Sequence, residues 1–136
     1  MYNTVNEDSI ADMVDTFYLA VRRDPLLGPI FADAIGDDWT PHLLKMRAFW
    51  SSVLLASRTY KGNPMIAHLR LPLLTARHFE RWLELWRDTA SSLCSQKLAE
   101  VFVQRAESIG ARLLFTISQY HSPAVREAAE AMSEAR

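Results

Sequence analysis

The stretch Gly62-Asn63-Pro64-Met65-Ile66-Ala67-His68-Leu69-Arg70-Leu71-Pro72 carries one histidine between two prolines. Pro64 can begin a helix, because the N–H group that it lacks would have no intrahelical partner there. Pro72 disfavours helical geometry at the residue before it, so the helix must end at that point. Roughly two turns at most remain, too few for a helix that is stable without tertiary contacts. The segment predicts a short connector that gives His68 a fixed direction, or else an ordinary surface histidine.

The apolar residues of this segment can anchor it on a core: Met65, Ile66, Leu69 and Leu71. The whole chain of 136 residues is long enough for one domain with a real core. Its four tryptophans and six phenylalanines are typical of a packed core or of the walls of a pocket for a flat cofactor.

Composition narrows the class of partner. The net charge of −1 gives no reason to expect nucleic acid or a membrane surface. Cys94 is the one cysteine, so no internal disulfide forms, which fits a reducing compartment. The apolar runs are too short to span a bilayer and no signal peptide is visible, so the expected location is the cytoplasm.

Hydrophobic spacing predicts an all-α fold of four long helices without strands. Asp8 or Ser9 is the expected cap of the first helix, which ends at Asp24-Pro25. The other three helices are expected over residues 40–57, 75–93 and 95–119. Residues 26–31 are expected to form a turn of 3₁₀ type, and residues 36–38 a loop. The predicted domain covers residues 1–122, and residues 123–136 form a helix-prone or disordered tail.

Each predicted helix has one apolar face. The face of the first helix consists of Ile10, Val14, Phe17, Tyr18 and Val21. The stripe of the second consists of His42, Met46, Phe49, Trp50 and Val53. The third has Phe79, Trp82, Leu83 and Trp86. The fourth is expected to point Leu98, Val101, Phe102, Arg105, Ile109, Leu113 and Ile117 inward.

Familiar catalytic motifs are missing: the sequence has no glycine-rich phosphate loop, HExxH, CxxC or GxSxG. Among the four histidines, His121 is expected in solvent and His78 at the rim of a site. His42 leads an apolar stripe, and His68 lies on the short connector. Two histidines from different elements that face an aromatic interior suit a metal macrocycle, with one bound to iron and the other opposite. The alternative is a cofactor-free helical interaction domain in which both are structural residues.

Five motifs in collinear order extend over roughly residues 4–120. They are Phe17-Tyr18, the run at 24–31 (DPLLGPIF), His42 with Phe49-Trp50, the run at 60–64 (YKGNP) with His68, and the run at 79–82 (FERW). Together they resemble the truncated haemoglobins, specifically the third group, bacterial proteins with a two-over-two helical sandwich around haem. The glycine pairs of the other two groups are absent, and Arg58 stands where glycine is common in the family.

The resemblance implies a role for particular residues. It implies His68 as the proximal iron ligand of a haem b, and Tyr18, His42 and Trp82 as the distal groups. It further implies that Phe31 packs on the haem face, that Met46 lines the distal cavity, and that Phe17 and Tyr60 contact the cofactor. Hydrogen-bond donors at the distal positions would stabilise the partial negative charge of bound O₂.

The implied function is binding of O₂, CO, NO or peroxide at iron. Three polar groups around one ligand exceed what reversible storage requires, so nitric oxide dioxygenase-like or peroxidase-like activity is open, with an electron donor or reductase as partner. In peroxide cleavage, His42 could move protons while Tyr18 or Trp82 donates hydrogen bonds.

Overall fold

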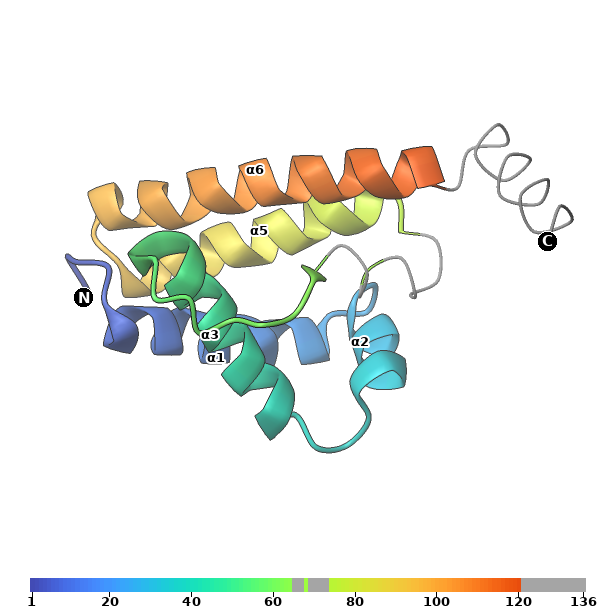
Figure 1. Cartoon of the computed structure of the whole chain (residues 1–136), viewed down its shortest axis with the longest axis horizontal. Coiled ribbons are helices and arrows are strands. Elements are labelled where there is room, and N and C mark those ends of the chain that lie inside the picture. The colour runs from blue at the N-terminus through green and yellow to red at the C-terminus, as the bar shows by residue number, and fades with distance from the viewer. Residues whose placement is uncertain (65–67, 69–73, 121–136) are drawn as a thin grey trace, which may run out of the picture.

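The computed structural model describes residues 1–64, 68 and 74–120. These residues form five named helices: α1 (Glu7–Arg23), α2 (Gly28–Ile35), α3 (Thr40–Leu55), α5 (Ala76–Leu93) and α6 (Gln96–Tyr120) (Figure 1). β pairing among the described residues is confined to one isolated bridge between Tyr2 and Cys94. The predicted all-α class is confirmed. None of the helices in this part of the chain is long and apolar enough to cross a membrane.

The helices form two packed pairs. α5 and α6 run antiparallel along the top of Figure 1, and α1 packs against α5 beneath them. α3 crosses α1 and makes the second pair, while α2 covers the far end of α1. This is the two-over-two arrangement that the sequence analysis expected.

The prediction of a 3₁₀ turn over residues 26–31 is wrong, because α2 is an α-helix that begins at Gly28. Pro29 lies in the first turn of α2, where its missing N–H costs nothing. Gly36 ends α2 with a positive φ of 81°, a conformation that favours glycine. The loop over residues 36–38 is therefore confirmed.

The first helix has a different cap from the one expected. The N-cap is Asn6 rather than Asp8 or Ser9, and its side chain accepts a hydrogen bond of 2.8 Å from the Ser9 N–H. The Ser9 hydroxyl accepts in return from the Asn6 N–H at 2.9 Å, which completes a capping box. Serine at the third helical position signals this box only weakly, since glutamate is the usual partner.

α3 ends at Leu55, two residues before the predicted end. Ala56 adopts left-handed backbone geometry with φ 55°, and Arg58 does so with φ 59°. Left-handed geometry at a residue with a side chain costs about 1–2 kcal/mol. Glycine at the position of Arg58 would adopt this geometry without that cost.

The inward face of α1 is confirmed, since all five of its predicted members are buried. On α6, Val101 is 44% exposed and Arg105 is also exposed, so both were wrongly predicted to point inward. Ala106 is fully buried instead, because the buried stripe runs from Leu98 through Phe102 in steps of three and four. The predictions for Met65, Ile66, Leu69, Leu71, His121 and residues 123–136 lie outside the described residues.

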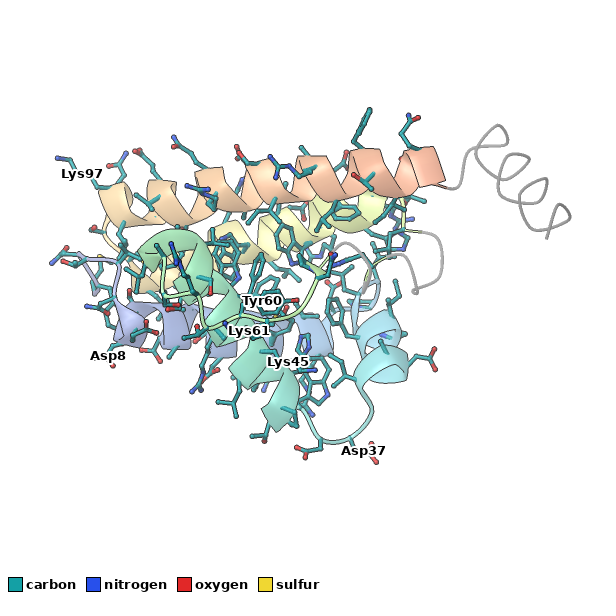
Figure 2. The ribbon with its side chains drawn as sticks, viewed as in Figure 1. Asp8, Asp37, Lys45, Tyr60, Lys61 and Lys97 are labelled. Atoms are coloured by element: carbon teal, nitrogen blue, oxygen red, sulfur yellow. The ribbon has the colours of Figure 1, made fainter. Side chains whose placement is uncertain are left out.

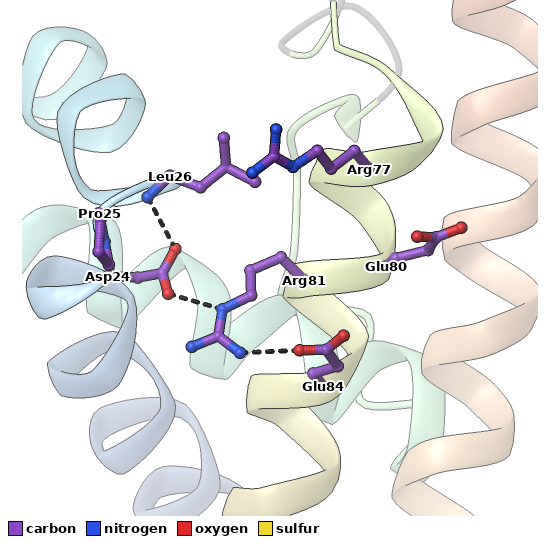
Figure 3. Close-up of a pocket in the computed structure, with 7 residues that line it drawn as sticks. All are labelled: Asp24, Pro25, Leu26, Arg77, Glu80, Arg81 and Glu84. Atoms are coloured by element: carbon purple, nitrogen blue, oxygen red, sulfur yellow. Dashed lines mark hydrogen bonds and ion pairs between the residues drawn. The ribbon is translucent and has the colours of Figure 1, made fainter.

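One carboxylate joins three helices. Asp24 follows α1, and its side chain is only 1% exposed. One oxygen accepts the backbone N–H groups of Leu26 and Leu27, at 3.1 and 2.9 Å, just before α2. The other oxygen accepts from the Arg81 Nε of α5 at 2.7 Å, beside a surface pocket of about 450 Å³ (Figure 3). Burial acts to raise the pKa of Asp24, but the Leu27 N–H and the Arg81 guanidinium outweigh it and lower the pKa.

Asp24→Asn is expected to lower the free energy of unfolding at neutral pH by about 1–3 kcal/mol, because it removes the charge that three donors share. Since the pKa of Asp24 is lowered in the folded state, its contribution is present above the unfolded value of about 3.9 and is lost as the pH falls below it. Urea unfolding at pH 7 and pH 3 should therefore show the gap between wild type and variant narrowing in acid. Glu84→Gln, at the exposed partner of Arg81, is the matched control and should change stability by less than about 1 kcal/mol.

Candidate functional site

Three helices bring aromatic side chains together at one place. Tyr18 of α1 meets His42 of α3 edge-on, with ring centroids 4.9 Å apart. Phe31 of α2 lies 5.8 Å from the Tyr18 ring and 6.3 Å from the His42 ring. Residues far apart in the sequence thus form one cluster, as expected for these three.

Trp39 belongs to the same cluster and was missed by the sequence analysis. Its ring is 6.0 Å from Tyr18, 5.8 Å from His42 and 6.2 Å from Phe31, on which it stacks. The Arg22 guanidinium lies 4.9 Å over its outer face, and Trp39 is only 6% exposed. The sequence does contain a signal for Trp39, because it lies three residues before His42 and so extends the same apolar stripe. The predicted stripe began inside the helix, at His42, and therefore left Trp39 out.

His42 carries the most unusual electrostatics of the cluster. Among the described residues, the Nε2 of His42 is a buried side-chain nitrogen that has no hydrogen-bond partner. Burial, then the charges of Lys45 and His68, lower the pKa of His42 to about 4. His42 is therefore neutral at physiological pH. A buried polar atom without a partner costs about 1–3 kcal/mol, and such atoms call for a functional explanation.

His68 is oriented by a hydrogen bond within its own short segment. Its Nδ1 lies 2.6 Å from the carbonyl oxygen of Pro64, four residues earlier. Since a carbonyl only accepts, Nδ1 must carry the proton, and the lone pair of Nε2 is left to bind a metal. His68 is one of the groups whose electrostatic interaction lowers the pKa of His42, so the two side chains lie within electrostatic range of each other.

Trp82 joins the cluster from α5 through Phe17. The rings of Trp82 and Phe17 meet edge-on at 6.1 Å, and Phe17 meets Tyr18 at 4.9 Å. Behind Trp82, a Cβ placed on Gly110 of α6 would lie 3.4 Å from the indole. α6 therefore approaches this indole closely and limits how far it can withdraw from the cluster.

The remaining candidate residues do not all lie near the Tyr18–His42 cluster. Met46, one turn after His42, is half-buried against the core, as expected for a lining residue. The Tyr60 ring packs on Phe49, with ring centroids 5.3 Å apart. A Cβ placed on Gly62 would lie only 2.6 Å from the Tyr60 hydroxyl oxygen. Its described ring contacts do not include the Tyr18–His42 cluster, so the structure sets Tyr60 apart from the distal candidates. His78 is part of the cap of α5, where its Nδ1 accepts the Thr75 N–H at 2.9 Å.

Solved structures share this fold. The crystal structure of a group III truncated haemoglobin from Campylobacter jejuni superposes with a TM-score of 0.82 at 35% identity, covering 88% of this chain and 96% of that one. A truncated oxygen-avid haemoglobin from Bacillus subtilis superposes with a TM-score of 0.70 at 27% identity, covering 81% of this chain and 94% of that one. The fold is thus the truncated globin fold.

Sequence comparison assigns the group. The group 3 truncated haemoglobin Ctb of Campylobacter jejuni is 35% identical over 122 residues, which is 88% of this chain and 96% of that protein. The group 2 truncated haemoglobin YjbI of Bacillus subtilis is 32% identical over 91 residues, or 64% of this chain and 66% of that protein. No family model matches the sequence. The chain belongs to the group 3 truncated haemoglobins.

His42→Leu is expected to raise the free energy of unfolding at pH 7 by about 1–3 kcal/mol, because it replaces a buried nitrogen that has no partner. The unfolded histidine titrates near 6.5 and the folded one near 4, so between these values the unfolded state binds the additional proton. Wild type should therefore lose stability as the pH falls from 6.5 to 4, and the variant should lose less. Urea unfolding across this range measures both effects.

The matched control is His78→Ala, since His78 is hydrogen-bonded in a helix cap. It should lower stability by about 1 kcal/mol. If His42→Leu destabilises the protein at pH 7 as His78→Ala does, the Nε2 of His42 has a partner in solution.

Proposed function

We propose that this chain binds one haem b beside the cluster formed by Tyr18, Phe31, Trp39 and His42, with His68 as the protein ligand of the iron. The observation that carries the proposal is the 2.6 Å hydrogen bond from His68 Nδ1 to the Pro64 carbonyl, which leaves Nε2 as the unprotonated nitrogen of the ring. A metal-binding histidine is commonly oriented in this way, with its other nitrogen donating to a carbonyl.

The residues of the cluster suit the group. Haem is flat and largely apolar, and Phe31 and Met46 offer apolar contact on the side of His42. The unpartnered Nε2 of His42 would gain a hydrogen-bond partner from a ligand held in the pocket. The bound iron would supply the coordination site for a diatomic ligand, and His68 would be its protein ligand.

The distal residues differ in what each can do. Burial raises the pKa of Tyr18, so its hydroxyl stays protonated and acts as a donor. The Trp82 indole is a donor only. His42 is neutral, with a pKa of about 4, so one of its ring nitrogens can donate a hydrogen bond and the other can accept one. Each well-placed donor stabilises a partially negative ligand such as O₂ by about 1–3 kcal/mol.

This donor set supports chemistry beyond storage. Donors that stabilise negative charge on a bound oxygen also favour O–O cleavage, while neutral His42 can accept a hydrogen bond from peroxide. We therefore extend the proposal to peroxidase-like or nitric oxide dioxygenase-like activity supplied by an electron donor or reductase. Reversible O₂ binding is the second candidate, and it is supported by the relative from Bacillus subtilis described as oxygen-avid.

His68→Gly is expected to lose haem or to hold it weakly, because no other described histidine has a ring that is oriented by a backbone carbonyl. Added imidazole should restore part of the binding, since it replaces the missing ligand. Absorption spectra of the ferric, ferrous and ferrous–CO forms measure this. A normal histidine-ligated ferrous spectrum in His68→Gly would refute the assignment, and a colourless folded wild type would support the cofactor-free interaction domain.

Trp82→Phe is expected to speed O₂ release by roughly five- to a hundredfold, because it removes one donor worth about 1–3 kcal/mol while keeping the ring that packs on Phe17. CO release should change much less, since bound CO carries less charge. Stopped-flow dissociation of both ligands tests this. Tyr18→Phe is the companion variant, and the two losses should not add if the donors share one network. An unchanged ratio of the O₂ and CO rates would return Trp82 to a purely structural role.

A further inference from the structure

Three of the four tryptophans of the chain form one stack. The Trp82 and Trp86 rings of α5 are 6.4 Å apart and 10° from parallel. The Trp86 and Trp50 rings are 4.6 Å apart and 16° from parallel, and Trp50 comes from α3. The stack begins at the candidate pocket, because Trp82 meets Phe17 and through it Tyr18. Offset-stacked and edge-to-face contacts are both preferred between aromatic rings, and here three indoles are stacked in one series.

Aromatic contacts continue from the far end of the stack to the surface. Trp50 meets Phe49 at 5.7 Å, and Phe49 meets Tyr60 at 5.3 Å. Tyr60 follows α3 and is only half-buried, with exposed Lys61 next to it (Figure 2). The series therefore joins the pocket to a phenol that solvent can reach.

The buried indoles of the stack are suited to transferring an electron to the next ring, and not to forming a stable radical. Trp86 is 1% exposed and Trp50 is 4% exposed. The Trp86 Nε1–H donates to the backbone carbonyl of Phe102 at 3.0 Å. A carbonyl is a weak base, so an oxidised Trp86 keeps its proton and remains a strong oxidant of its neighbour. The phenol of Tyr60, in contrast, can release a proton to water when it is oxidised.

We propose that the Trp82–Trp86–Trp50 stack conducts electrons from Tyr60 at the surface to the haem pocket, so that donors too large for the pocket are oxidised at Tyr60. The proposal rests on the peroxide chemistry proposed above. Hydrogen peroxide takes up two electrons and two protons and becomes two molecules of water. Each electron leaves Trp82 and is replaced through Trp86 and Trp50 from Tyr60, whose phenol loses its proton to water and becomes a neutral radical.

The surface around Tyr60 indicates the class of donor. Arg58, Lys61 and Lys45 are exposed, the first two beside Tyr60 in sequence and the third one turn before Phe49. Their positive charge would attract an anionic reductant such as ascorbate. The donor gives one electron and one proton to the Tyr60 radical, and two donor molecules are consumed for each peroxide. The phenol is restored after each transfer.

The experiment uses the full chain loaded with haem, with hydrogen peroxide and a nitroso spin trap. Peptide mass spectrometry locates the adducts, and the amount of adduct at each residue is divided by the amount of peroxide consumed. Wild type should carry the adduct on Tyr60. Trp50→Phe interrupts the stack outside the pocket and should reduce the Tyr60 adduct at least fivefold while the Soret band is kept. Ile117→Val, which also shortens a buried side chain but lies outside the core cluster of Trp50 and Trp86, should keep the Tyr60 adduct.

A second variant covers the case in which Trp50→Phe does not fold. Tyr60→Phe changes one half-buried hydroxyl, and it should move the adduct to a tryptophan of the stack and slow the oxidation of ascorbate. Arg58→Gln together with Lys61→Gln should raise the KM for ascorbate by roughly two- to fivefold at low salt, with kcat unchanged.

The outcomes separate this inference from the proposed function. Peroxide consumption without a Tyr60 adduct, or an equal adduct in Trp50→Phe, overturns the electron path and leaves haem binding and peroxide chemistry in place. A wild type without a Soret band overturns both. A Tyr60 adduct lost equally in Ile117→Val and Trp50→Phe also overturns the path, because the loss then follows from general disturbance of the core.

Discussion

The hydrogen bond from His68 to the Pro64 carbonyl is the constraint on which the proposed site depends. Pro64 cannot donate a hydrogen bond, but its carbonyl lies one helical turn before His68 and can accept one, at 2.6 Å. This carbonyl therefore fixes the tautomer and direction of the histidine ring. Without this bond the ring could rotate, and Nε2 would have no defined position relative to His42.

The opposite side of the site contains an unfavourable feature that the fold must offset. His42 buries a nitrogen without a partner, and its pKa of about 4 reflects the cost of charging it there. The surrounding aromatic rings of Tyr18, Phe31 and Trp39 hold it in place. Asp24 supports this geometry at a distance, because it joins the end of α1 to the residues before α2 and to Arg81 of α5. A polar group that destabilises the fold while three helices are arranged around it is typical of a functional site.

The aromatic content of the chain has two distinct uses in this structure. Around His42 the rings meet mostly edge-on and enclose a polar centre. Between α3 and α5 the indoles lie nearly parallel and connect the pocket to Tyr60. Composition alone predicted either a core or a cofactor pocket, and the contacts contain elements of both.

The sequence by itself determined the elements whose signal is periodic. Apolar spacing predicted α1, α3, α5 and α6 to within a few residues, and it correctly pointed Tyr18 and His42 inward. It failed at α2, at the Asn6 cap and at Trp39, and it wrongly turned Val101 and Arg105 inward. Only the tertiary structure decided the start of α2 and the burial of Trp39. α2 begins close to the point where the distant Arg81 binds the Asp24 carboxylate. Trp39 is buried by rings from two other helices. Periodicity records which face of a helix avoids water, whereas the arrangement of the site depends on contacts between residues that spacing along the chain does not relate.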